Sequence, residues 1–426
     1  MVRYDLPYEM EGNGQKVGTI DENEAPVERV ILVAISERDG DDTVASLEEL
    51  AELAATAGAE VVGTVIQNLE HMNPGTYVGS GKLEEIRDMI WEKEATGIIC
   101  DDELSPIQMK NMEQVLDSKV MDRTLLILDI FAARARTSEG KIQVELAQLK
   151  YRASRLAGFG RSMSRLGGGI GTRGPGEKKL EIDRRLIGHR TAQLNRELKE
   201  VVRHRELTRS QRMKSHTKVA AIVGYTNAGK STLLNTLTNA GVLEEDQLFA
   251  TLDPTTRVLE LENHQNLMLT DTVGFIRKLP HHLVDAFKST LEEAKYADFI
   301  VHVVDASNPQ WDTQMHVVYA TLQDLGVTDK KIITLFNKCD RVTGEEILQD
   351  FRADKTLRIS AKTGQGLDTL KEVFEDLLRD GKVLLKHTFP YEKAGEIQKI
   401  RKYGELLKEE YTPDGIYVEA YVPPEL

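Results

Sequence analysis

The chain has 426 residues, a length typical of two to four domains. Hydrophobic residues make up 40% of it and charged residues 29%, which excludes a disordered chain of low hydrophobicity. The formal net charge of −14 argues against a uniformly basic nucleic-acid coat and against a protein that binds anionic membranes. Two cysteines are too few for a disulfide framework, and no apolar run reaches the ~20 residues of a membrane span, so we expect a cytoplasmic protein.

The first part of the chain is predicted to form a tail followed by an α/β domain. Residues 1–27 are polar and acidic and are expected to form a flexible tail. Over residues 28–133, buried-strand patterns alternate with helical patterns, which predicts a parallel sheet flanked by helices. The predicted strands are residues 28–36, 59–67 and 96–100, and the predicted helices are residues 46–58, 83–94 and 105–117.

Residues 134–216 form a separate basic segment. Between positions 134 and 218 there are 22 basic and 8 acidic residues, a net charge of +14, so the rest of the chain carries −28. Apolar residues recur every seven positions in two stretches, which predicts an antiparallel hairpin of two amphipathic helices, the second spanning about 177–213. These residues are Ile142, Leu149 and Leu156 in the first helix and Leu180, Ile187, Leu194 and Val201 in the second.

The two predicted helices are joined by a glycine-rich tip over residues 158–176, where 8 of 19 residues are Gly. A segment of that composition does not hold a helix, so we expect a flexible tip. A long arm that ends in a cationic, flexible loop is suited to an anionic partner, whereas the alternative is a solvated intramolecular coiled coil.

Strand–helix alternation returns over residues 217–382, with strands predicted at 218–224, 266–271, 298–306, 330–338 and 356–360. Residues 385–426 are expected to form a small α+β unit with a helix near 393–410 and a turn at the Pro-Asp-Gly sequence that follows.

A phosphate-binding loop follows the first of these strands. The sequence GYTNAGKS at 224–231 fits the pattern GxxxxGK[ST] and stands between a strand and a helix, the context that such a loop requires. Lys230 is expected to bridge the β- and γ-phosphates, and Ser231 to ligate Mg²⁺. The residues expected at the nucleotide here are Gly224, Tyr225, Thr226, Asn227, Ala228, Gly229, Lys230, Ser231 and Thr232.

Guanine is selected by a second motif, Asn337-Lys338-Cys339-Asp340, about 110 residues after the phosphate loop. The Asp340 carboxylate can accept hydrogen bonds from both donors on the edge of guanine, and adenine presents no such pair of donors. Ser360-Ala361-Lys362 follows a further strand, where a backbone N–H can reach the guanine carbonyl. Together these motifs predict GTP as the substrate.

Two loops are expected to detect the γ-phosphate. In Asp271-Thr272-Val273-Gly274, Asp271 would hold Mg²⁺ through water and the Gly274 N–H would face the γ-phosphate. The second loop, FATLDPTTR, offers three threonines as Mg²⁺ ligands, Thr251, Thr255 and Thr256, of which we favour Thr251. Its residues expected at the nucleotide are Phe249, Ala250, Thr251, Leu252 and Asp253.

The residue after Gly274 is Phe275, where Ras-like enzymes usually place a glutamine that orients water. Phe275 cannot orient water, so we expect slow intrinsic turnover and a site completed by another element, a partner or a cation. Asn227 is a candidate ligand for K⁺, a hypothesis that fails if turnover is equal in Na⁺ and K⁺. The residues expected in catalysis are Lys230, Thr251, Gly274 and Asn227.

The fold class expected from these patterns is α/β: an N-terminal α/β domain, a long antiparallel helical arm, a Ras-like P-loop GTPase domain and a small α+β C-terminal unit. One weaker motif, Gly79-Ser80-Gly81-Lys82, opens a predicted helix in the N-terminal domain. It reads as an ordinary loop–helix turn or an RNA contact, with a second nucleotide site as the alternative.

The chain resembles the HflX GTPases of the Obg–HflX group from about residue 28 to 380. The resemblance is carried by GGGIGTRGPGE at 167–177, LEIDRR at 180–185, the phosphate loop, DQLFATLDPTTR at 246–257, DTVGFIRKLPHHLVDAFKSTLEE at 271–293 and RTLLILDIFAARARTSEGKIQVELAQLKY at 123–151. Lys178-Lys179 departs from the Thr-Gln that the family usually has there.

The resemblance implies a GTPase that binds the 50S subunit with its 23S rRNA and the 70S ribosome, and that splits or rescues stalled ribosomes, notably under heat stress. It implies that the N-terminal domain and arm enter near the peptidyl transferase centre, with the chain acting as a monomer. It also implies Ser231 and Thr251 as Mg²⁺ ligands, with Asp271 acting through water. ATP hydrolysis by the N-terminal domain is reported in the family, which keeps Gly79–Lys82 open.

The basic arm suits rRNA phosphates independently of that resemblance. The residues expected to contact RNA are Arg155, Arg161, Arg165, Arg173, Lys178 and Lys179. Two alternatives stay open: a nucleotide-sensing switch protein that binds RNA or 50S without splitting ribosomes, and an ATP-driven RNA remodeller that uses the N-terminal domain.

Overall fold

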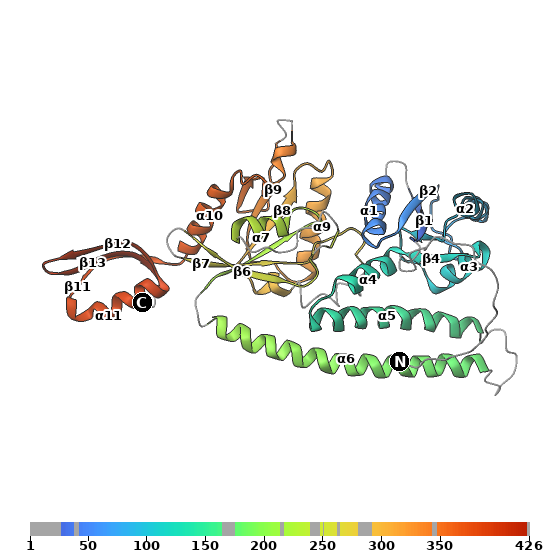
Figure 1. The fold of residues 1–426 in the computed structure, drawn as a ribbon, viewed down its shortest axis with the longest axis horizontal. Coiled ribbons are helices and arrows are strands. Elements are labelled where there is room, and N and C mark those ends of the chain that lie inside the picture. Colours follow the sequence, from blue (N-terminus) through green and yellow to red (C-terminus); the bar gives the residue numbers. More distant parts are fainter. Residues whose placement is uncertain are drawn as a thin grey trace, which may run out of the picture.

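The structure is a computed structural model. It describes residues 27–37, 42–163, 175–213, 217–238, 248–249, 251–261, 265–279, 292–342 and 347–423. Two α/β parts lie beside one another above a long helical hairpin, and a small sheet-and-helix part carries the C-terminus (Figure 1). The predicted tail, apart from residue 27, lies outside the described residues, as do Ala250 and residues 164–174 of the predicted tip, which include Arg165 and Arg173. The prediction that 158–176 holds no helix is wrong at both ends, because residues 158–163 and 175–176 belong to helices.

The N-terminal domain is a four-stranded parallel sheet in the order β2-β1-β3-β4. Successive apolar side chains along its strands point to opposite faces of the sheet. One face packs against α1 and α4 and the other against α2 and α3. Its fourth strand and the helix after it were not predicted, because Lys119–Asp122 is only four residues long. The elements are β1 Arg29–Ser36, α1 Thr43–Thr56, β2 Glu60–Asn68, α2 Ser80–Lys93, β3 Gly97–Cys100, α3 Pro106–Leu116, β4 Lys119–Asp122 and α4 Arg123–Arg134.

Helices α5 (Ser138–Met163) and α6 (Pro175–Met213) form the hairpin (Figure 1). Ile142, Leu146 and Leu194 are buried together between them, with Leu149, Leu198 and Val201 packed against this group. The heptad spacing places these residues on facing sides of the two helices, which is why a narrow apolar seam joins them.

The predicted P-loop domain, residues 217–382 and called the G domain below, contains a six-stranded sheet in the order β10-β9-β8-β5-β7-β6. All of its pairings are parallel except that of β6 with β7. The carboxyl ends of β5, β7 and β9 meet at one edge, where ligands of parallel sheets bind. The elements are β5 Val219–Gly224, α7 Lys230–Thr238, β6 Thr255–Glu260, β7 Asn266–Asp271, β8 Phe299–Asp305, α9 Trp311–Asp324, β9 Lys331–Asn337, β10 Lys355–Arg358 and α10 Leu367–Arg379.

The C-terminal unit is an antiparallel sheet in the order β11-β13-β12, covered on one face by α11. The predicted helix near 393–410 is wrong beyond Tyr403, because α11 ends there and the following residues form a strand paired with β13. The elements are β11 Val383–Phe389, α11 Ala394–Tyr403, β12 Glu405–Thr412 and β13 Gly415–Val422. The predicted α/β class is confirmed, since two mostly parallel sheets alternate with helices and the phosphate-loop sequence stands between β5 and α7. No helix in the described part of the chain is long and apolar enough to cross a membrane.

Candidate functional site

A set of converging polar residues lines a cleft at the carboxyl edge of the G-domain sheet. Loops after β5, β7, β9 and β10 form it, so residues far apart in sequence meet there. The lining residues are Thr226, Asn227, Gly229, Lys230, Ser231, Thr232, Phe249, Thr251, Gly274, Asn337, Lys338, Asp340, Arg341, Ser360, Ala361 and Lys362. All but Arg341 belong to the motifs singled out in the sequence.

The phosphate loop is shaped by backbone constraints around Gly229. This residue has a φ of +93°, and a Cβ there would lie 2.3 Å from Nδ2 of Asn337, so only glycine fits. The ammonium of the adjacent Lys230 donates to the carbonyl of Tyr225 at 2.8 Å. Burial lowers the pKa of Lys230 to about 8, although the nearby Asp271 opposes the shift. A buried ammonium with one backbone partner is suited to binding phosphate oxygens.

Three oxygen-bearing side chains meet beside Lys230. The hydroxyl of Ser231 donates to Oδ2 of Asp271 at 2.7 Å and lies 2.8 Å from the hydroxyl of Thr251. Oδ1 of Asp271 is buried and has no hydrogen-bond partner among the described residues. Burial also raises the pKa of the Asp271 carboxyl. A buried carboxylate oxygen without a partner, grouped with two hydroxyls, fits a hard divalent cation such as Mg²⁺.

Ser231, Thr251 and Asp271 are therefore the residues that would hold Mg²⁺ with the nucleotide. The ion would supply positive charge to neutralise the phosphate oxygens. Thr255 and Thr256, the other two threonines considered, lie in β6 instead. The hydroxyl of Thr256 is 3.0 Å from that of Thr270 on the neighbouring strand.

Asn337 connects the two loops at the guanine end of the cleft. Its Nδ2 donates to the carbonyl of Ala228 in the phosphate loop at 2.9 Å, and its Oδ1 accepts from the Ala361 N–H at 2.9 Å. Asp340 is exposed, and a hydrogen bond from Ser360 holds the pKa of its carboxyl below the usual value. A charged, accessible carboxylate is what recognition of the two guanine donors requires.

The loop after Gly274 is paired with the phosphate loop through its backbone. The N–H of Thr226 donates to the carbonyl of Phe275 at 2.8 Å, and the N–H of Phe275 donates to the carbonyl of Gly224 at 3.1 Å. The Phe275 side chain is only 1% exposed and packs in the core. Phe275 therefore has no route to a reacting water.

Several residues expected at the nucleotide have side chains that point elsewhere. Leu252 is buried in an apolar cluster, and the Asp253 carboxylate accepts hydrogen bonds from the start of α5. The Tyr225 hydroxyl bonds to Glu49 of the N-terminal domain and accepts from the Arg277 N–H at 2.8 Å. These side chains are turned towards neighbouring parts of the chain rather than into the cleft.

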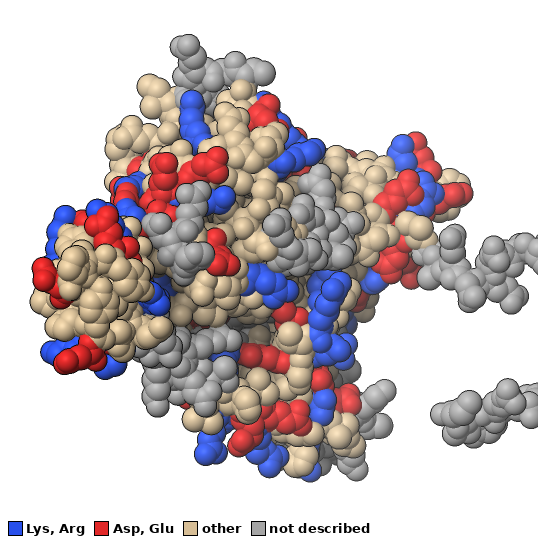
Figure 2. All heavy atoms as spheres, turned by 60° about the vertical axis from the view of Figure 1, so that its left-hand side comes forward, with Lys and Arg blue, Asp and Glu red and all other residues tan. Residues whose placement is uncertain are grey.

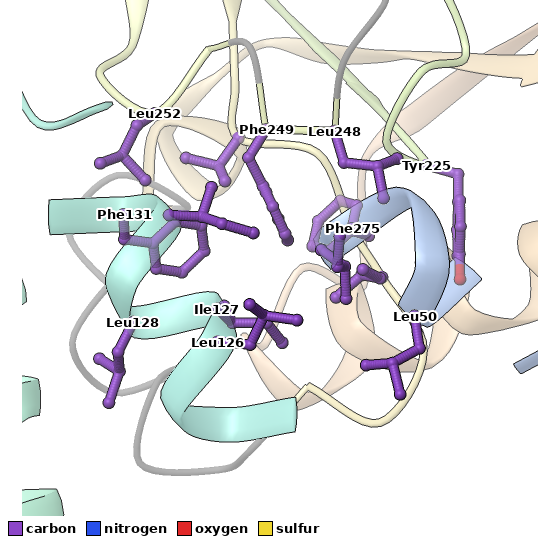
Figure 3. Packing of buried hydrophobic residues seen from close by; sticks show 14 of the residues in the cluster. Leu50, Leu126, Ile127, Leu128, Phe131, Tyr225, Leu248, Phe249, Leu252 and Phe275 are labelled. Carbon is purple, nitrogen blue, oxygen red and sulfur yellow. The ribbon is translucent and has the colours of Figure 1, made fainter. Parts of the chain in front are cut away.

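A single apolar cluster joins the nucleotide loops to the N-terminal domain (Figure 3). Leu248, Phe249 and Leu252 come from the loop that carries Thr251, and Phe275 comes from the loop after β7. They pack against residues of α1 and α4 that include Leu50, Leu126, Ile127 and Phe131. The rings of Phe131 and Phe249 meet edge to face with centroids 4.6 Å apart. Both nucleotide loops thus form part of one core with the N-terminal domain.

A buried charged network lies at the same junction, and none of its residues belongs to a motif predicted as a site. Arg123 is 1% exposed and binds Asp101 at 2.7 Å and Glu49 at 2.6 Å. Lys278, in the loop after β7, pairs with Asp101 at 2.5 Å and with Asp102 at 2.6 Å. Charged residues directly after β3 and β4 were the available signal, because the ends of parallel strands collect functional groups.

Of the residues expected to bind RNA, the structure describes the side chain of Arg155 alone. Arg155 is mostly buried, pairs with Asp122 at 2.6 Å and donates to the Leu104 carbonyl at 3.1 Å, so the structure argues against an RNA contact for it. The side chains of Arg161, Arg165, Arg173, Lys178 and Lys179 lie outside those described.

Gly79 begins α2 as an ordinary loop–helix turn. Its N–H donates to Oε1 of Gln67 at 2.8 Å, and Lys82 pairs with Glu85 one turn on. With the first donor of the turn already satisfied, the geometry favours the simple turn over a second phosphate site.

The fold and the cleft define a P-loop GTPase in which the nucleotide loops contact an additional N-terminal domain. Family models agree: residues 44–132 match the GTP-binding GTPase N-terminal model, residues 134–212 the GTP-binding GTPase middle region, and residues 219–338 the 50S ribosome-binding GTPase model. The chain belongs to the HflX family of GTPases and hydrolyses GTP.

Relatives of this family match along most of the chain. The GTPase HflX of Lacrimispora saccharolytica is 66% identical over 94% of this chain and 94% of its own length. That of Escherichia coli strain K12 is 40% identical over 82% of this chain and 83% of its own. A solved GDP complex of a GTP-binding protein from Sulfolobus solfataricus is 25% identical, with a TM-score of 0.44, over 83% of this chain and 99% of that one.

Proposed function

We propose that this GTPase binds the large ribosomal subunit and uses its nucleotide cycle to dissociate or rescue stalled 70S ribosomes under stress. The observation that carries the proposal is the shared core between the nucleotide loops and the domain that holds the arm. A change in these loops between GTP and GDP would be transmitted to the N-terminal domain and through it to the arm.

The arm supplies the surface for RNA. Its net charge of +14 contrasts with −28 on the rest of the chain. On the face seen in Figure 2, basic and acidic side chains are interspersed. The negative net charge of the rest of the chain limits non-specific attraction to RNA outside the arm. Phosphate contacts of this kind position a protein rather than select a sequence. Contact with 23S rRNA, a monomeric state on the particle and a cytoplasmic location complete the proposal.

The nucleotide site would need an activating element, because Phe275 is buried and cannot orient water. Asn227 lines the cleft and has a φ of +60°, which supports the proposal that it helps to hold a K⁺ ion beside the phosphates. Equal GTP turnover in Na⁺ and K⁺ buffers would remove K⁺ from the proposal without affecting Mg²⁺.

Sucrose-gradient sedimentation of 70S ribosomes with the protein and a non-hydrolysable GTP analogue tests the function. We expect free subunits to increase, with the protein on 50S. Deletion of residues 158–176 should abolish splitting and leave GTP binding intact, whereas Lys230→Ala should abolish the nucleotide dependence. Binding of 50S by the full chain without loss of the 70S peak would instead support a switch protein that does not split ribosomes.

A further inference from the structure

The loop that carries Thr251 is attached to the first turn of the arm. The Asp253 carboxylate accepts hydrogen bonds from the backbone N–H groups of Arg136 and Thr137, both at 2.9 Å, and from the Thr137 hydroxyl. Thr137 in turn accepts the Gly140 N–H at 3.0 Å through its hydroxyl. Thr137 therefore caps the start of α5, and Thr137 is itself held by Asp253, a residue more than one hundred positions further along the chain in a loop of the nucleotide site.

Gly140 leaves room for this contact. A Cβ at Gly140 would lie 2.5 Å from Oδ1 of Asp253, so the Asp253 side chain would have to shift away from its present contacts. Glycine is unfavourable inside a helix, so its presence in the first turn of α5 needs a reason, and the approach of Asp253 supplies one. Gly188 in α6 offers a contrast, because a Cβ there would meet nothing within 4 Å.

The same loop is held on both sides of Thr251. Before it, Phe249 is 2% exposed and packs on Phe131; after it, Leu252 is 3% exposed in the same cluster. Figure 3 shows Phe249 and Leu252 approaching α4. Between these anchors the Thr251 hydroxyl lies 2.8 Å from that of Ser231. Fixing Leu252 and Asp253 against α4 and α5 thus fixes where Thr251 points.

We propose that Asp253 is a positioning residue for GTP binding and hydrolysis: it holds Thr251 at the Mg²⁺ site by anchoring the loop to the base of the arm. Asp253 acts through Thr251, since its own carboxylate is occupied by α5. A displacement of the first turn of α5 would therefore move Thr251, and the arm would tune the nucleotide site directly. The inference rests on GTP hydrolysis and not on the proposed ribosomal role.

The rival explanation is that Asp253 holds the capping residue Thr137 in place and does nothing else. Such a contact stabilises the protein but has no reason to distinguish GTP from GDP. Thr251 does have such a reason, because a loop threonine of this kind is ordered by the γ-phosphate and its Mg²⁺. Affinity for a non-hydrolysable GTP analogue, compared with affinity for GDP across a Mg²⁺ titration, separates the two explanations.

Fluorescence titrations of the full-length protein provide the test. For Asp253→Ala we expect analogue affinity to fall about tenfold and the half-saturating Mg²⁺ to rise about tenfold, with GDP affinity within about twofold of wild type. Asp253→Asn should be intermediate, because its amide oxygen still accepts from both backbone N–H groups. Asp354→Ala is the matched control, since Asp354 also accepts a backbone N–H, from Ile332 at 2.8 Å, but at the far end of the sheet.

Gly140→Ala keeps the test valid if Asp253→Ala folds poorly. Alanine favours the helix, yet its Cβ displaces Asp253, so the analogue should bind more weakly while thermal stability falls less than in Asp253→Ala. Gly188→Ala gains the same helix preference and should bind both nucleotides as wild type does. Equal losses of analogue and GDP affinity in the Asp253 and Gly140 variants, or wild-type analogue binding in both, would overturn the proposal.

Discussion

Replacing Arg123 with methionine is expected to be among the most destabilising single changes in the N-terminal domain. Its guanidinium is 1% exposed, and it compensates Asp101 and Glu49 while also donating to the Ser46 carbonyl at 2.9 Å. Removing one member of a buried charge pair typically costs about 3–5 kcal/mol, since the partner charge is left unpaired. We expect the lower end, about 3 kcal/mol, because Lys278 still pairs with Asp101.

Urea unfolding followed by circular dichroism measures this loss. A double-mutant cycle with Lys278→Met adds a sharper result: with both cations gone, Asp101 is buried without compensation, so the two losses should sum to less than the double variant's loss. Glu49→Gln is the matched comparison, because it neutralises one carboxylate and leaves Asp101 paired. A loss under about 1 kcal/mol for Arg123→Met, or simple additivity in the cycle, would refute the assignment of this network as a coupled unit.

Three further predictions concern single sites. His302 is buried, and neither of its ring nitrogens is hydrogen-bonded among the described residues. Burial lowers the pKa of His302 to about 4, so on acidification the unfolded chain binds the proton before the folded chain does. The free energy of unfolding should therefore fall by up to ~3 kcal/mol as the pH drops from about 6.5 to 4. His302→Leu should flatten this part of a plot of melting temperature against pH, and an unchanged slope would contradict the argument. Asp340→Asn replaces an acceptor with a donor facing guanine, so calorimetry should show GTP affinity falling by about tenfold or more; unchanged GTP affinity would exclude Asp340 as the guanine partner. Phe249→Ala removes the edge-to-face contact with Phe131, and faster hydrogen exchange at the start of β6 and in α4 is expected, with α10 as the unaffected reference.

The nucleotide cleft was predictable because its motifs are local. In the phosphate loop, strand, glycines and lysine follow one another within a dozen residues, so spacing alone reports the structure. Thr251 was harder to separate from Thr255 and Thr256 by sequence. The structure separates them because Thr255 and Thr256 lie in β6, which pairs with β7, whereas Thr251 lies in the loop before it.

The junction between domains was not predictable in the same way. The ion pairs of Lys278 join residues more than 170 positions apart, and no periodicity along the chain reports such a contact. Arg155 was misread for a related reason: in a basic segment it looks like a free cation, whereas folding brings Asp122 beside it. The helix predicted near 393–410 extends too far because Glu405–Thr412 is rich in charged residues, a composition common in exposed helices. In the structure these residues form β12, and pairing with β13 overrides their local preference for helix.

Coupling between the arm and the nucleotide site is tested most directly by steady-state GTP turnover with and without saturating 50S subunits, in K⁺ buffer with Mg²⁺. The isolated protein should turn over slowly, because Phe275 is buried and its backbone is paired with the phosphate loop. Binding of the arm to 50S should reach the nucleotide loops through the shared core and raise turnover severalfold or more. A rate that 50S leaves unchanged, with the protein shown to be bound, would contradict the central claim that the arm and the nucleotide site are coupled.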